Sequence, residues 1–235
     1  MVADVFSEDK EVSIMRYKGL IFDFDYTLGD STDGIVLCTN YALERLGYDA
    51  AERETVRKTI GLHLEEIYRV LVSGQGRIIK ASEESEFARL FMEKADEVMT
   101  ENSSFFPGAL TLVREWKKQG YKLGIVTTKY HHRIEAILEK YQEPDLFDMI
   151  VGGDEVKYPK PDPQGIFHVL GEWDLSREQV LYVGDSLVDA RTAQAAGVDF
   201  AGVTTGTTGE EEMQNYPNVG VFAGLEEMQK KILNN

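Results

Sequence analysis

Three features of the sequence predict an α/β fold with a parallel sheet at its core. Short apolar runs recur along the chain, helix-like segments separate the later runs, and polar motifs follow the runs. The expected strands lie at residues 20–24, 123–127, 149–151, 180–183 and 200–203. Alternation of strands and helices at this spacing predicts a Rossmann-like parallel sheet with helices on both faces.

The elements of this core follow in order along the chain. The first strand begins with the apolar residues Leu20, Ile21 and Phe22, as expected of a buried strand. The helices expected between the later strands span residues 107–119, 131–141, 163–171 and 187–196. We therefore assign residues 1–28 and 106–235 to the core domain.

Residues 29–105 interrupt this alternation. They contain no convincing strand and are expected to form four helices, at residues 32–46, 51–59, 64–71 and 82–99. An insertion after the first strand lies above the carboxyl edge of the sheet, where ligands bind in open α/β folds. A helical cap over a site is the natural interpretation, and an insertion that only enlarges the core is the alternative.

Composition narrows the class of protein. The chain has 235 residues and a formal net charge of −16, which argues against nucleic acid as a partner because its phosphates need a basic surface. The single cysteine, Cys38, excludes an internal disulfide and fits a reducing cytosol. No signal peptide is recognised, and no apolar stretch approaches the roughly 20 residues that span a bilayer. We expect a soluble cytoplasmic protein without a membrane partner, whose oligomeric state the sequence does not predict.

Two carboxylates stand at the end of the first expected strand. Asp23 and Asp25 are two residues apart, so on a strand they would share one face. Two carboxylates at such a short distance repel each other. The pair therefore suits a divalent cation, a division into nucleophile and acid, or both.

Two further motifs could hold an anion. Thr127 and Thr128 follow the second expected strand and precede a helix, where a hydroxyl and free backbone N–H groups make an anion seat. Simple capping of that helix by Thr128 is the alternative. Lys160 stands among Pro159, Pro161 and Pro163, which would hold its positive charge in place, although an ordinary exposed lysine has the same pattern.

The fourth motif follows the strand at residues 180–183. Gly184 allows close approach of the backbone, Asp185 lies at the strand end, and Asp189 lies one helical turn further on. Two acids four residues apart can coordinate a hard cation. They also stabilise the helix dipole without any metal, which is the alternative.

The four motifs, in this order, resemble those of the haloacid dehalogenase-like phosphohydrolase superfamily, and most of all its phosphoglycolate phosphatase-like branch. The resemblance covers residues 18–28 and 106–206. Residues 29–105 are similar to the C1-type cap of that family in length and helical character. Tyr26 stands where most members have glycine, and Thr128 replaces a frequent asparagine. Tyr26 is therefore expected to reshape the mouth of the site.

The resemblance implies a role for each motif. Asp23 would be the nucleophile and Asp25 the general acid and base. The Asp23 carboxylate, the Asp25 backbone carbonyl and Asp185 would hold Mg²⁺. The remaining residues would support the phosphate: Thr127, Thr128 and Lys160 by holding its oxygens, and Asp189 by orienting Lys160 or a metal-bound water.

The expected function is that of a Mg²⁺-dependent phosphatase, which hydrolyses a small organic phosphate monoester such as a phosphoglycolate-like compound or a sugar phosphate. A phosphosugar mutase of the β-phosphoglucomutase type, an inorganic pyrophosphatase of the same fold and a non-enzymatic binding protein are the alternatives. Substrate choice is expected to lie in the cap, with His63, Arg77 and Lys80 as candidates.

Overall fold

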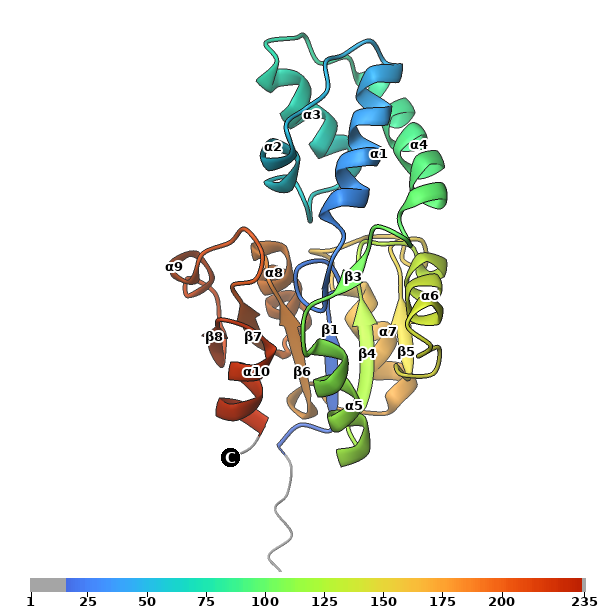
Figure 1. Cartoon of the computed structure of the whole chain (residues 1–235). Coiled ribbons are helices and arrows are strands. Elements are labelled where there is room, and N and C mark those ends of the chain that lie inside the picture. Colours follow the sequence, from blue (N-terminus) through green and yellow to red (C-terminus); the bar gives the residue numbers. More distant parts are fainter. Residues whose placement is uncertain (1–15, 234–235) are drawn as a thin grey trace, which may run out of the picture.

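The computed structural model describes residues 16–233, which form a six-stranded sheet with a separate group of helices above one edge (Figure 1). The strand order is β5-β4-β1-β6-β7-β8, and every neighbouring pair is parallel. The strands are β1 (Gly19–Phe22), β4 (Lys122–Val126), β5 (Met149–Val151), β6 (Val180–Gly184), β7 (Asp199–Val203) and β8 (Gly220–Phe222). The predicted fold class, a parallel Rossmann-like sheet, is confirmed.

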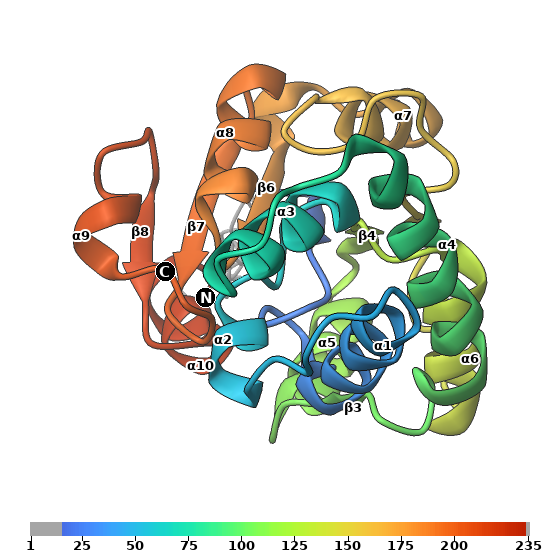
Figure 2. The same cartoon turned by 90° about the horizontal axis from the view of Figure 1, so that it is seen from above.

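Helices cover both faces of this sheet (Figure 2). One face carries α5 (Ala109–Gln119), α6 (His131–Lys140) and α10 (Leu225–Met228), and the other carries α7 (Gln164–Trp173) and α8 (Leu187–Ala196). The remaining short elements of the core are η1 (Arg177–Gln179), α9 (Glu210–Met213) and the π-helical turn η2 (Gln229–Leu233). No helix among residues 16–233 is both long enough and apolar enough to cross a membrane.

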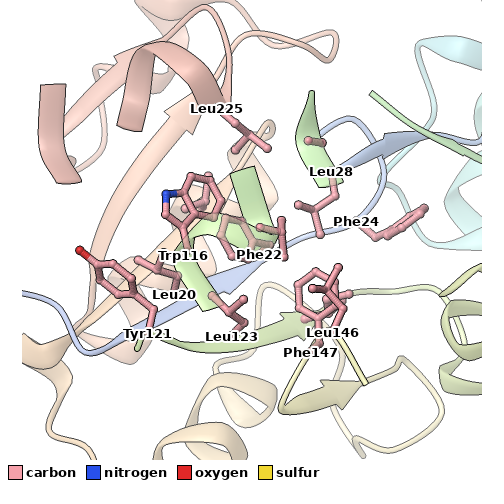
Figure 3. Close-up of a cluster of buried hydrophobic side chains, with 14 of the residues drawn as sticks. Leu20, Phe22, Phe24, Leu28, Trp116, Tyr121, Leu123, Leu146, Phe147 and Leu225 are labelled. Carbon is pink, nitrogen blue, oxygen red and sulfur yellow. The ribbon is translucent and has the colours of Figure 1, made fainter. Parts of the chain in front are cut away.

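The central strand β1 is buried on both faces, and alternate side chains enter two different cores. Leu20 and Phe22 enter the cluster beneath α5 and α10, whereas Ile21 packs against α7 and α8. Phe22 stacks on Trp116 of α5, with ring centres 5.5 Å apart (Figure 3). Burial of the Phe22 and Trp116 rings anchors β1, so the residues that follow this strand are held in fixed positions.

The four predicted helices between residues 29 and 105 form a body with its own apolar core. They are α1 (Thr32–Arg45), α2 (Arg53–Arg57), α3 (Leu64–Gly74) and α4 (Ala81–Val98). Tyr68 and Phe87 are fully buried at the centre of this core. The body stands above the carboxyl ends of the strands (Figure 1).

Two short strands outside the main sheet were not predicted, and neither was the edge strand β8. β2 (Gly29–Asp30) and β3 (Ser104–Phe105) pair antiparallel where the chain leaves the sheet domain and returns to it. The expectation of no strand between residues 28 and 106 is therefore wrong, because two-residue strands leave no periodic pattern. The predicted division of the chain at residues 28 and 105 falls at this ladder and stays a prediction.

Candidate active site

The two acids of the first motif lie between the end of β1 and a tight turn. β1 ends at Phe22, one residue before Asp23. The chain then reverses: Tyr26 has a φ of 58°, and its N–H donates to the Gly29 carbonyl at 2.7 Å. Asp25 forms an isolated bridge with Gly29. A left-handed conformation costs a residue with a side chain about 1–2 kcal/mol, so the backbone at Tyr26 is one that favours glycine.

Lys160 joins Asp23 to Asp189. Its Nζ atom lies 3.0 Å from Asp23 Oδ1 and donates to Asp189 Oδ1 at 2.7 Å. The hydroxyl of Tyr182 lies 3.2 Å from the same Nζ and donates to Asp189 Oδ1 at 2.9 Å. Burial alone would lower the pKa of Lys160, but Asp189 and Asp23 raise it well above its usual value. The ammonium group is therefore charged at neutral pH and fixed on three sides.

The start of α8 holds Asp189 in place. Ser186 caps the helix, and its hydroxyl donates to Asp189 Oδ2 at 2.6 Å. Gly184 lies so close that a β-carbon there would collide with the Asp189 side chain. Both oxygens of Asp189 therefore have protein partners.

Three buried carboxylates could hold a divalent metal ion. Ligand atoms of Asp23, Asp185 and Asp189 all lie within 4.8 Å of one another. Burial raises the pKa of Asp23 to about 6, although Lys160 opposes the effect, and burial also raises the pKa of Asp185 well above its usual value. Burial thus disfavours the charged forms of Asp23 and Asp185, and a divalent cation beside them would offset this cost.

Most of the predicted site residues surround one small pocket. It is lined by Asp23, Asp25, Tyr26, Ile60, Gly61, Thr128, Lys160, Asp185, Ser186 and Val188. Thr127 is buried beside this pocket, and its Oγ1 accepts the N–H of Lys129 at 3.3 Å. Asp189 lies behind Lys160. The structure thus brings the four sequence motifs together at the carboxyl edge of the sheet.

The segment between α2 and α3 closes the pocket, with Ile60 and Gly61 in its wall. His63 Nε2 lies 3.0 Å from the Lys160 carbonyl oxygen, so His63 reaches the site. Arg77 is exposed and Lys80 pairs with Glu83 at 2.8 Å, and neither lines the pocket.

Arg57 is a second contact between the two bodies. Its guanidinium lies 5.5 Å from the centre of the Tyr26 ring, and its Nη2 donates to the Gly206 carbonyl at 3.4 Å. The Tyr26 side chain is buried, with its hydroxyl 2.7 Å from Thr32 Oγ1. Tyr26 therefore forms part of the contact between the helical body and the sheet domain.

A larger cavity of about 270 Å³ adjoins the pocket. The two share Asp25, Ile60, Gly61 and Thr128 in their walls. The cavity also contains Lys129, whose side chain is 5% exposed and whose Nζ lies 3.3 Å from Asp25 Oδ2. The sequence reasoning missed Lys129 as a site residue, because a lysine at the start of a helix has the pattern of a solvated side chain. Its place directly after Thr128 was the available signal.

The family assignment agrees with this geometry. The family model for haloacid dehalogenase-like hydrolases matches residues 20–203. The chain belongs to the haloacid dehalogenase-like hydrolase family. This finding confirms the family recognised in the sequence.

Named relatives lie in one branch of the family. A phosphoglycolate phosphatase of Cereibacter sphaeroides (strain ATCC 17025) is 32% identical over 210 residues, which cover 89% of this chain and 95% of the relative. A phosphoglycolate phosphatase of Photorhabdus laumondii is 31% identical, and the match covers 80% of this chain and 81% of the relative. The predictions of a phosphoglycolate phosphatase-like hydrolase and of a phosphoric monoester hydrolase are confirmed.

Solved structures share the whole architecture. A haloacid dehalogenase-like hydrolase from Bacteroides fragilis superposes with a TM-score of 0.84 at 41% identity, over 90% of this chain and 99% of that one. A predicted phosphoglycolate phosphatase from Haemophilus somnus superposes with a TM-score of 0.82 at 25% identity, over 92% and 98%.

Proposed function

We propose that the protein is a Mg²⁺-dependent phosphatase, which hydrolyses a small organic phosphate monoester through an aspartyl-phosphate on Asp23. The observation that carries the proposal is the buried pocket in which Asp23 meets Lys160 and lies beside Asp185. The names of the relatives support a phosphoglycolate-like substrate. The acidic composition and the buried single cysteine Cys38 support a cytoplasmic site of action.

The nucleophile is Asp23. Its carboxylate oxygen forms a bond to phosphorus while the bond between phosphorus and the ester oxygen breaks. Lys160 is fixed by Asp189 and places its positive charge where the phosphoryl oxygens gather charge in the transition state. Thr127 and Thr128, at the end of β4, supply hydroxyl and backbone N–H donors to the same oxygens.

Asp25 is the general acid and then the general base. It lies on the turn beyond Asp23 and lines both the pocket and the adjoining cavity, so it stands between the phosphoryl site and the leaving group. It protonates the leaving oxygen in the first step. In the second step it takes a proton from the water that hydrolyses the aspartyl-phosphate.

The metal site consists of the Asp23 carboxylate, the Asp25 backbone carbonyl and Asp185. Mg²⁺ bound there would offset the repulsion between an anionic nucleophile and an anionic substrate. Asp185 is fixed for this role by its contact with Gly206, since a β-carbon at residue 206 would collide with the Asp185 carboxylate. Helices α1–α4 act as a cap that excludes water from the pocket.

The test is phosphate release from a substrate panel that contains phosphoglycolate, sugar phosphates, pyrophosphate and p-nitrophenyl phosphate. We expect release that requires Mg²⁺, stops with EDTA and is absent in Asp23→Asn. Asp145→Asn, at an exposed position in the loop before β5, is the matched control and should keep full activity. Transfer of phosphate between two positions of a sugar without release would instead establish the mutase, and no turnover of any compound would contradict the proposal.

A further inference from the structure

The cavity next to the catalytic pocket is built to hold more than a phosphate. Its walls come from α1, α3, α4 and the start of α6. Just over half of the lining residues are apolar, among them Ile35, Ile67, Phe91 and Met99. An apolar wall of this kind binds hydrocarbon and excludes ions that have no partner. Such a wall would accommodate an apolar part of a leaving group.

One buried cation, Lys129, faces this cavity and has N–H donors available for a ligand. Among residues 16–233, the only charged partner of Lys129 Nζ is Asp25, whose Oδ2 lies 3.3 Å away. An ammonium has three N–H donors, so donors remain for a ligand. Arg133 also lines the cavity, but its guanidinium donates to Asp96 Oδ1 and to the Met92 carbonyl. Lys129 is thus the cation in this wall that is placed to bind an anionic group.

The position of Lys129 defines where that anionic group must lie. In the proposed reaction Asp25 hydrogen-bonds the ester oxygen that leaves. The Lys129 ammonium lies 3.3 Å from Asp25 Oδ2. It can therefore reach substrate groups that lie one or two bonds beyond the ester oxygen. A carboxylate on the carbon that bears the phosphate meets this requirement, and its charge-assisted hydrogen bond to Lys129 would be strong.

The volume of the cavity exceeds what the smallest such acid needs. Without its ester oxygen, glycolate contributes four non-hydrogen atoms. At the roughly 30 Å³ that a water molecule occupies in the liquid, they fill at most about 120 Å³. The cavity offers about 270 Å³. More than half of it is therefore left for an apolar substituent.

We propose that the enzyme prefers phosphate esters of 2-hydroxy acids with an apolar substituent on the carbon that bears the phosphate, and that Lys129 binds their carboxylate. This inference rests on the proposed function. The phosphorus–oxygen bond of the ester breaks, the phosphoryl group passes to Asp23 and then to water, and the hydroxy acid leaves with a proton from Asp25. Lys129 is thereby a specificity-determining residue.

The test compares matched esters with and without the carboxylate. Phosphoglycolate and ethyl phosphate differ chiefly by that group, and the phosphates of 2-hydroxypropanoate and 2-hydroxy-4-methylpentanoate add apolar bulk. In the wild-type enzyme, we expect kcat/KM to rise from ethyl phosphate to phosphoglycolate and again with bulk. Lys129→Met should lower kcat/KM for the carboxylates by about 10- to 100-fold and for ethyl phosphate by less than about 3-fold.

Two further variants make the test specific. Lys129→Arg keeps the charge and should restore much of the preference, whereas Lys58→Met, at an exposed position in the cap, should leave all the values unchanged. Equal losses for charged and uncharged esters in Lys129→Met would overturn the inference, because Lys129 would then act only by positioning Asp25. If Lys129→Met does not fold, the comparison of the four esters in the wild-type enzyme decides. A higher kcat/KM for ethyl phosphate than for phosphoglycolate, or for phosphoglycolate than for the substituted esters, would overturn the inference. No hydrolysis even of p-nitrophenyl phosphate would instead reject the proposed function itself.

Discussion

Replacing Asp23 by asparagine should make the metal-free protein more stable while it abolishes activity. Burial raises the pKa of this carboxyl from its ordinary value of 3.8 to about 6, against the opposing attraction of Lys160. The difference, 6 minus 3.8, is about 2 pH units and corresponds to a penalty of about 3 kcal/mol for the charged form. Asparagine carries no charge, and Lys160 keeps Asp189 as its partner at 2.7 Å.

The sign of the pH dependence follows from proton binding. Between pH 3.8 and about 6, the folded protein retains a proton on Asp23 that the unfolded chain has lost. The free energy of unfolding therefore falls as the pH rises through this window, and the penalty is complete above it. The raised pKa of Asp185 acts in the same direction. Asp23→Asn removes the contribution of Asp23, so we expect the variant to be more stable by about 3 kcal/mol at pH 7.5 and by about half of that at pH 5.

Urea denaturation in EDTA at the two pH values measures these differences. Mg²⁺ should then stabilise the wild type more at pH 7.5 than at pH 5, because only charged carboxylates bind it, and should stabilise Asp23→Asn much less. The exposed Asp145→Asn is the control and should match the wild type at both pH values. If Asp23→Asn were the less stable protein at pH 7.5 without metal, the attraction to Lys160 would exceed the cost of burial, and the reasoning would be refuted.

Three other changes test separate parts of the structure. Tyr182→Phe removes the hydroxyl that contacts Lys160 and Asp189, so steady-state kinetics should show kcat lowered about 10-fold with a smaller change in KM; an unchanged kcat would contradict this role. Arg57→Met removes the cation over the Tyr26 ring and should raise KM about 2- to 5-fold, and an unaltered KM would mean that this contact does not hold the cap. Trp116→Ala should lower the free energy of unfolding, measured by urea denaturation, by about 3–5 kcal/mol. Trp116→Phe should lower it by less than about 1.5 kcal/mol, because the buried Nε1 has no hydrogen-bond partner among residues 16–233. Equal costs for the two Trp116 variants would be inconsistent with an unpaired indole N–H.

The sheet was predictable because its signal is local. Strands such as β6 are short apolar runs, and the polar residues that follow them mark the carboxyl edge. Edge strand β8 (Gly220–Phe222) was missed because it begins with glycine and so has only two apolar residues, whereas the predicted edge strand β5 (Met149–Val151) is apolar throughout. It is held in place by long-range packing, in which Phe222 joins the central cluster.

The four motifs of the site could be found in the sequence, but the contacts between them could not. Lys129 and Arg57 both have the local pattern of exposed basic residues on short or starting helices. Only the folded arrangement buries Lys129 beside Asp25 and lays Arg57 over Tyr26. Such contacts join residues far apart in the chain, so their charge and burial depend on the tertiary fold rather than on any local pattern.

The phosphorylated form of Asp23 is the most direct test of the account. The enzyme would be mixed with Mg²⁺ and an ester that it hydrolyses, and the reaction would be quenched in acid within a single turnover. The protein would then be digested and examined by mass spectrometry. We expect one phosphoryl group on the peptide that contains Asp23, absent when EDTA is present and absent in Asp23→Asn. A phosphoryl group on another residue, or phosphate release at full rate without any labelled peptide, would contradict the assignment of Asp23 as the nucleophile.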